Sequence, residues 1–132
     1  MSRPYEKGKL CEWELIKILR LSGFVCIRSP GSGRGRRTWY PDVVAVRNGR
    51  AIFIEVKCFS DDRHVPIPLE KFRRMIWLSK HAGVKFFICV KYEDVGSFRC
   101  VDLNSYDSIG EKYVMYRREK ILSGRDPKDL EA

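Results

Sequence analysis

Apolar residues recur along the chain with two different periods, and these periods predict its secondary structure. A spacing of three to four residues predicts amphipathic helices over residues 6–22 and 68–83, closed by Gly23 and Gly83. Shorter apolar runs rich in β-branched residues predict strands within 24–30, 42–59, 85–93 and 97–103, and 112–118 is a further candidate. The order αβββαββ predicts an α/β fold, a sheet with helices packed on it.

The run 42–59 predicts a hairpin that gathers ionisable groups. Asn48-Gly49 between two apolar runs is the typical sequence of a two-residue type I′ turn. With that turn, Asp42 lies directly opposite Glu55, and Lys57 shares their face because side chains alternate along a strand. Two close carboxylates need positive charge beside them. Lys57 supplies one charge, and an oxygen-liganded divalent cation such as Mg²⁺ would supply two. The alternative is a plain ion-pair cluster on a solvated face.

The first predicted helix adds a third acid. Projected at about 100° per residue, Glu12 falls within the apolar arc and points toward the sheet, whereas Lys17 and Arg20 lie on the opposite face. An inward glutamate is costly unless it is paired or bound to metal. Pairing with Lys57 or with an arginine is the purely structural alternative.

The charge of the chain indicates a polyanionic partner. Lys and Arg number 26 against 17 Asp and Glu, a formal charge of +9, so nucleic acid is the first candidate. No apolar run is long enough for a membrane span, and the polar N-terminus shows no signal peptide. We therefore expect a cytoplasmic, DNA-associated protein formed by a single domain, residues 1–132, with a polar tail from about residue 123. The five cysteines have no zinc-type spacing and are expected to be reduced and buried.

A glycine- and arginine-rich stretch, GSGRGRR (31–37), is predicted to be a DNA-binding loop. Its glycines permit close backbone approach and its arginines can neutralise phosphates. The predicted DNA-binding residues are Arg34, Arg36 and Arg37 in this loop, with Lys7, Lys9 and Arg28 extending the surface. Ordinary solvated charges are the alternative for both groups.

Pro41-Asp42 followed by Glu55-Val56-Lys57 has the form of the PD-(D/E)xK nuclease motif. Around it, KGKLCEWELIKILRLSGFVCIRSPGSG resembles the N-terminal half of archaeal Holliday junction resolvases of the Hjc type. The shared features are a lysine-glycine start, an inward glutamate on the first helix, Gly-Phe before the first strand, and an Arg-x-x-x-Ser-Gly loop. The resemblance covers roughly residues 5 to 100.

The resemblance implies a restriction-endonuclease-like fold, a central mixed β-sheet flanked by helices, and specific site residues. The catalytic residues it implies are Glu12, Asp42, Glu55, Lys57 and Ser32, and the implied metal ligands are Glu12, Asp42, Glu55 and the backbone carbonyl of Val56. The implied cofactor is Mg²⁺, with Mn²⁺ able to substitute and no small-molecule cofactor. One departure is Lys71, where relatives often carry glutamine; we assign it no role from sequence.

The resemblance further implies a homodimer that resolves a four-way DNA junction by two symmetric nicks. Trp77 projects away from the core-facing arc of the second predicted helix, as an interface anchor would, although it could equally cover a neighbouring loop. Two other functions stay open. One is a restriction-like, repair or RNA-directed nuclease of the same superfamily, and the other is a basic protein that binds DNA without cutting it.

Overall fold

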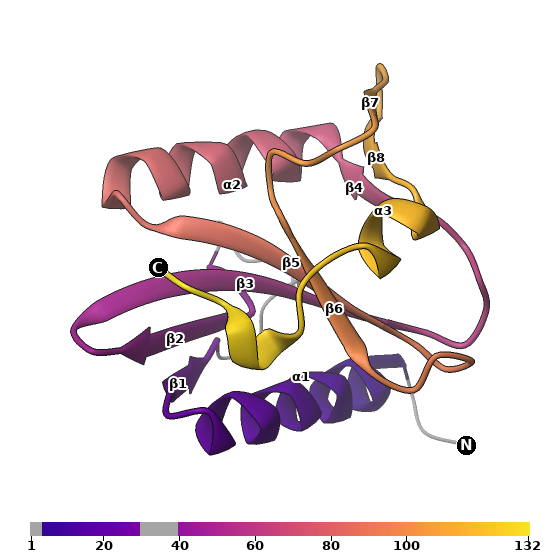
Figure 1. Ribbon diagram of the computed structural model, residues 1–132. Helices are drawn as coiled ribbons and strands as arrows, with labels where there is room; N and C mark the ends of the chain where they lie inside the picture. Colours follow the sequence, from indigo (N-terminus) through magenta and orange to yellow (C-terminus); the bar gives the residue numbers. More distant parts are fainter. Residues whose placement is uncertain (1–3, 30–39) are drawn as a thin grey trace.

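The computed structural model describes residues 4–29 and 40–132 (Figure 1). Its elements follow the predicted order, with one unpredicted strand just before the second helix and further elements after the last predicted strand of the main sheet. The helices are α1 (Pro4–Leu21), α2 (Leu69–Ala82) and α3 (Arg118–Leu122), with a 3-10 turn η1 (Pro127–Asp129). The strands are β1 (Val25–Arg28), β2 (Val43–Arg47), β3 (Arg50–Phe59), β4 (Val65–Pro68), β5 (Lys85–Tyr92), β6 (Phe98–Asp102), β7 (Ser108–Ile109) and β8 (Tyr113–Tyr116). Within these ranges, no helix has the length and apolar character needed to cross a bilayer.

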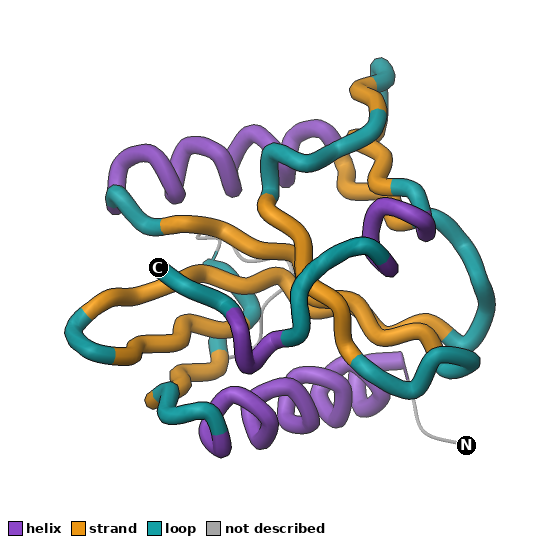
Figure 2. Tube along the Cα trace, viewed as in Figure 1, coloured by secondary structure: helices purple, strands orange, loops and turns teal. Residues whose placement is uncertain are grey.

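A five-stranded mixed sheet in the order β1-β2-β3-β5-β6 forms the centre of the fold. Its β3–β5 pair is parallel, and its β1–β2, β2–β3 and β5–β6 pairs are antiparallel. Helix α1 covers one face and α2 the other, as Figures 1 and 2 show. Leu15 and Leu19 of α1 are fully buried in one core cluster, and Met75 of α2 is fully buried in the other. The predicted α/β fold with helices on a mixed sheet is therefore confirmed.

The β2–β3 hairpin has the predicted register. Asn48 and Gly49 both have positive φ, 55° and 74°, as a type I′ turn requires. Val43 pairs with Ile54 across the two strands, so the residue before Val43, Asp42, comes next to Glu55. Because side chains alternate, Ile54 and its neighbours two positions away face α1, whereas Glu55 projects to the α2 face. The hairpin thus places Glu55 and Lys57, with Asp42 beside them, on the α2 side of the sheet.

A second, three-stranded sheet in the order β4-β8-β7 fixes the start of α2. The stretch 112–118 was a candidate strand, and β8 confirms it. β4 runs directly into α2, where the Leu69 N–H donates to the Lys112 carbonyl at 2.9 Å, one residue before β8. The pairing of β4 with β8 therefore holds the first turn of α2 at a defined place over the main sheet.

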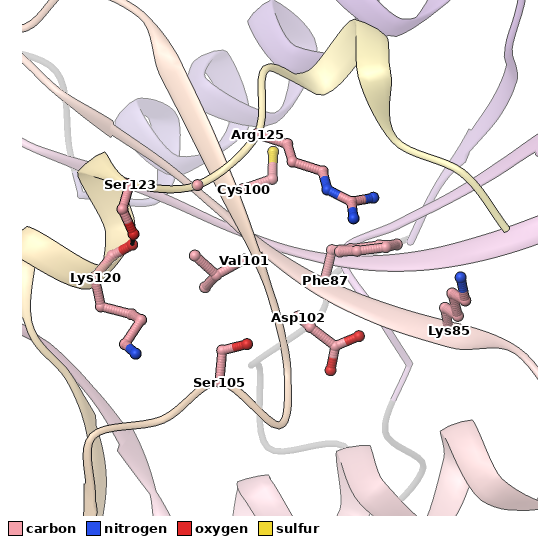
Figure 3. Close-up of a pocket in the computed structure, with 10 residues that line it drawn as sticks. Lys85, Phe87, Cys100, Val101, Asp102, Ser105, Lys120, Ser123 and Arg125 are labelled. Carbon is pink, nitrogen blue, oxygen red and sulfur yellow. Dashed lines mark hydrogen bonds between the residues drawn. The ribbon is translucent and has the colours of Figure 1, made fainter.

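The polar segment from residue 123 onward is docked on the fold. Leu130 is fully buried against the α1 side of the core, and Arg47 Nη2 donates to its carbonyl at 2.7 Å. Arg125 forms an isolated antiparallel bridge with Cys100 of β6. Between this segment and the sheet lies a cavity of about 270 Å³ lined in part by Lys85, Asp102 and Arg125 (Figure 3). Of the predicted site residues that the structure describes, none lines this cavity.

The prediction of reduced cysteines is wrong for four of the five. Cys11 of α1 is bonded to Cys58 of β3, and Cys89 is bonded to Cys100, its directly opposed partner on β6. Cys26 is the one free thiol in the described residues. The prediction failed because each bond depends on how two elements are placed. Cys11 and Cys58 are 47 residues apart and meet only through the packing of α1 on the sheet, and Cys89 and Cys100, 11 residues apart, are opposed only by the β5–β6 register.

Candidate active site

Two carboxylates and two ammonium groups form a compact cluster on the α2 face of the sheet, which we call the acid–lysine cluster: Asp42, Glu55, Lys57 and Lys71. Glu55 lies at its centre and is only 1% exposed. Its Oε2 atom is 2.5 Å from Lys71 Nζ and 3.7 Å from Lys57 Nζ. Lys57 comes from the same strand two residues on, while Lys71 reaches down from the first turn of α2. The sequence prediction that Glu55 and Lys57 share a face is confirmed.

Asp42 is anchored by backbone groups at the edge of the hairpin. Its Oδ2 atom accepts the Val56 N–H at 2.9 Å, which ties it to the strand that carries Glu55 and Lys57. Its carbonyl accepts the Ser29 N–H at 3.0 Å, and the Ser29 hydroxyl donates to the Pro41 carbonyl. Ser29, at the end of β1, therefore fixes the backbone at Pro41-Asp42, and the position of the carboxylate follows from that.

The environment of the site opposes the ionisation of Asp42. Burial raises the pKa of Asp42 well above its ordinary range, and the charge of Glu55 raises it further, against the opposing Val56 hydrogen bond and Lys71. For Lys71, burial lowers the pKa, but the Glu55 and Asp42 carboxylates outweigh it and the net shift is upward. Asp42 therefore resists ionisation, while the Lys71 ammonium group stays charged beside it.

Glu12 points inward from α1, as predicted, but its partner is an arginine. Arg28 Nε lies 3.2 Å from Glu12 Oε1, and the two side chains are 17% and 13% exposed. Burial raises the pKa of Glu12, Arg28 lowers it, and the charge of Glu55 raises it again. Glu12 is therefore close enough to the acid–lysine cluster for the charge of Glu55 to shift its pKa. It approaches from the α1 side, whereas Asp42 and Glu55 are on the α2 side.

The oxygen atoms of this site suit a hard divalent cation. Glu55 Oε1 is buried and has no hydrogen-bond partner among the described residues, an arrangement that is costly unless a cation or water meets it. Across residues 4–29 and 40–132, no three His, Cys, Asp or Glu side chains gather closely enough to hold a metal by themselves. Mg²⁺ typically binds through one or two carboxylates and keeps several waters, so Asp42 and Glu55 suffice as its protein carboxylates.

The other predicted residues fall into three groups. Ser32, Arg34, Arg36 and Arg37 fall outside the described residues. Lys7 and Lys9 are exposed on the first turns of α1. Arg28, predicted to bind DNA, is mostly covered, with its guanidinium 5.9 Å from the centre of the Trp13 ring and its Nε beside Glu12; its DNA-binding role stays a prediction. The structure thus brings Arg28 to the site as a partner of an acid.

Two residues of this site were not assigned from sequence. In the sequence, Lys71 is only a departure from the resemblance, and a lysine on an amphipathic helix carries no sign of a partner 16 residues earlier. Ser29 is a lone serine at a strand end, with no pattern around it. Only the three-dimensional placement of α2 and of the β1 end reveals their contacts.

Comparison with known proteins gives a consistent result. The sequence model of the family described as archaeal Holliday junction resolvase (Hjc) matches residues 3–123. The crossover junction endodeoxyribonuclease Hjc of Sulfurisphaera tokodaii is 32% identical over 91 residues, which are 69% of this chain and 63% of that protein, a little under two thirds of its length. The protein of the same name from Methanocaldococcus jannaschii is 29% identical over 123 residues, covering 93% of this chain and 86% of that protein.

A solved structure shares the fold. The Hjc Holliday junction resolvase of Archaeoglobus fulgidus superimposes with a TM-score of 0.81 over 92% of this chain and 98% of that one, at 20% identity. At 20% identity this match shows a shared fold only. Membership of the family is shown by the sequence model. Because that model spans nearly the whole chain, the protein belongs to the archaeal Holliday junction resolvase (Hjc) family.

Proposed function

We propose that this protein is a metal-dependent endonuclease that resolves four-way DNA junctions by paired, symmetric nicks. The observation that carries the proposal is the acid–lysine cluster itself. It places a buried carboxylate with one unsatisfied oxygen, Glu55 Oε1, beside Asp42 and Lys57 in a chain of formal charge +9. A protein that only binds DNA gains nothing from clustered acids that would face a polyanion. Membership of a family of junction resolvases supports the choice of substrate.

The residues of the site have distinct roles in this proposal. Asp42, Glu55 and the Val56 carbonyl hold Mg²⁺, for which Mn²⁺ substitutes. A divalent ion supplies Lewis-acid activation of the scissile phosphate and of the attacking water. Lys57, 32% exposed, stabilises the negative charge that develops on the phosphate. Glu12, oriented by Arg28, holds a water at the edge of the site, and Ser32 acts from the segment that follows β1.

The DNA is bound largely through phosphate contacts. The exposed lysines at the start of α1, Lys7 and Lys9, and the arginines of the 31–37 segment provide the positive charge for this. In this proposal Arg28 acts by orienting Glu12 and not by contacting a phosphate. An enzyme with this substrate acts in the cytoplasm on DNA. Its activity requires no small-molecule cofactor in this scheme.

A homodimer accounts for two symmetric nicks, since a C2 pair presents two identical sites. The exposed apolar residues of the β1 edge, Val25 (70% exposed) and Ile27 (61%), project to the face of the sheet opposite α1. On α2, Trp77 is 59% exposed and stacks on His81 with ring centroids 4.2 Å apart. We propose that these apolar surfaces contribute to the dimer. Light scattering at micromolar concentration should give twice the chain mass, and Ile27→Glu should shift the equilibrium toward monomer.

The experiment that tests the function compares two substrates. A labelled mobile four-way junction and a linear duplex of the same sequence are incubated with the protein, each with Mg²⁺ and with EDTA. Paired nicks in opposing strands of the junction alone, dependent on Mg²⁺, are the expected result. Equal cutting of both substrates would retain the nuclease and reject junction selectivity, which is the alternative of a restriction-like or repair enzyme.

Matched variants separate catalysis from binding. Glu55→Gln should abolish cutting while junction binding persists, whereas Glu93→Gln, which replaces an exposed glutamate, should cut like the wild type. Tight junction binding without cutting by the wild type in either Mg²⁺ or Mn²⁺ would reject the enzyme and leave a non-catalytic DNA-binding protein.

A further inference from the structure

Lys71 makes the closest charged contact of the acid–lysine cluster. Its Nζ atom is 2.5 Å from Glu55 Oε2, compared with 3.7 Å for Lys57. Its side chain is 29% exposed, while that of Glu55 is 2% exposed, so the ammonium group reaches from the surface to a buried acid. The β4–β8 pairing holds the first turn of α2 in place above the site. The contact is therefore part of the fold and does not depend on a long, free side chain finding a surface partner.

The contact divides the Glu55 carboxylate into two unequal oxygens. Oε2 faces both lysines, whereas Oε1 is buried and accepts no hydrogen bond from the described part of the chain. Lys71 thus orients the carboxylate so that its unsatisfied oxygen is the one left for a cation. It does so without occupying that oxygen itself.

The formal charges of the cluster cancel before any ion binds. Asp42 and Glu55 contribute two negative charges, and Lys57 and Lys71 contribute two positive ones. A divalent cation added to this cluster leaves an excess of two positive charges in a partly buried site, where like charges repel strongly. A DNA phosphate that entered the site would bring one negative charge and so halve that excess.

We propose that Lys71 is a positioning residue that orients Glu55 and, through its own charge, keeps divalent-metal binding weak until a DNA phosphate enters the site. The inference rests on the proposed function, because it concerns the metal and the phosphate of that reaction. Its consequence is reciprocal coupling: DNA tightens metal binding and metal tightens DNA binding by the same factor. The enzyme would then load its metal mainly on DNA.

The test is a calorimetric titration of the DNA-free protein with Mn²⁺. Lys71→Gln removes the charge and keeps a hydrogen-bond donor. Lys71→Arg keeps the charge. Lys80→Gln, an exposed lysine on the same helix, is the matched control for net charge. We expect Lys71→Gln to bind Mn²⁺ about tenfold more tightly than the wild type, within the range of roughly 5- to 150-fold typical of coupled sites. Lys71→Arg and Lys80→Gln should bind it as the wild type does.

A second titration measures the coupling with DNA. A nicked duplex, the expected product, offers phosphate without further cutting, and at saturation it should tighten Mn²⁺ binding more in the wild type than in Lys71→Gln. Equal Mn²⁺ affinity of Lys71→Gln and Lys80→Gln would overturn the proposal. So would weaker binding by Lys71→Gln, because Lys71 would then only hold Glu55 in place for the ion. Failure of the wild type to cut junctions would reject the nuclease by a separate assay.

Discussion

Replacing Cys58 by serine removes the bond that joins α1 to the end of β3 and changes little else in the folded state. Cys58 is exposed, so the serine leaves no cavity, and Cys11 stays as a buried thiol that is 5% exposed. The Cα atoms of the pair are 6.1 Å apart, an ordinary separation for a disulfide, so the backbone has no strain to release when the bond is absent. The effect on stability should therefore come mainly from the unfolded chain.

The magnitude follows from the length of the loop that the bond closes. Cys11 and Cys58 are 47 residues apart in sequence. In the chain-entropy treatment, removing a cross-link that closes a loop of that length lowers the free energy of unfolding by about 4 kcal/mol. Domains of this size have a total stability of about 5–15 kcal/mol. The variant should consequently lose a large fraction of its stability, yet stay folded at room temperature.

Guanidinium unfolding under non-reducing conditions measures this loss. Cys58→Ser should show a lower midpoint and a steeper dependence on denaturant, because its unfolded chain is more expanded. Cys26→Ser, which replaces the free and partly buried thiol, controls for the exchange of sulfur for oxygen. If Cys58→Ser loses no more stability than Cys26→Ser, the cross-link does not constrain the unfolded chain and the reasoning is wrong.

Three further predictions concern the Asp42 carboxylate, the arginines of the 31–37 segment and Gly124. The pKa of Asp42 is raised in the folded protein, so its charge opposes folding above the ordinary aspartate pKa of about 3.9. Asp42→Asn should therefore stabilise the metal-free protein at pH 7 and leave its stability unchanged near pH 2, as thermal unfolding at the two pH values would show. Replacing the arginines of the 31–37 segment by alanine should reduce the slope of log affinity against log salt by about 0.9 for each phosphate that is no longer neutralised, measured by anisotropy; an unchanged slope would remove that segment from the DNA surface. In Gly124→Ala the new Cβ would overlap the Cys100 carbonyl oxygen and should cost about 1–3 kcal/mol in the free energy of unfolding, whereas Gly8→Ala on α1 meets open space and should not destabilise.

The hairpin could be predicted from sequence because a local signal determines it. Asn48-Gly49 fixes the turn, the turn fixes the register, and the register brings Asp42 next to Glu55. The inward direction of Glu12 likewise follows from the helical period of its own neighbours. In each case the residues that determine where a side chain points are close to it in the sequence.

The contacts that sequence could not supply depend on how separate elements pack. Lys71 reaches Glu55 only because the β4–β8 pairing positions the start of α2. β4 has only 4 residues and two of them are prolines, so its sequence does not predict a strand. The partner of Glu12 is Arg28, which is brought to it by the approach of β1 to α1. The cysteine pairs depend in the same way on register and packing between elements. Sequence periodicity predicts which face a residue takes, and packing decides which group it meets.

The contacts of Ser29 with Pro41 and Asp42 join the two ends of the segment that links β1 to β2. These hydrogen bonds hold the two ends of the connection together, and none of them involves a residue between Ser29 and Pro41. The position of the Asp42 carboxylate is thereby insulated from the length and composition of the intervening stretch, and lengthening a loop whose ends are already joined costs little free energy. The stretch between these ends can therefore be exchanged as a module while the acid–lysine cluster keeps its geometry.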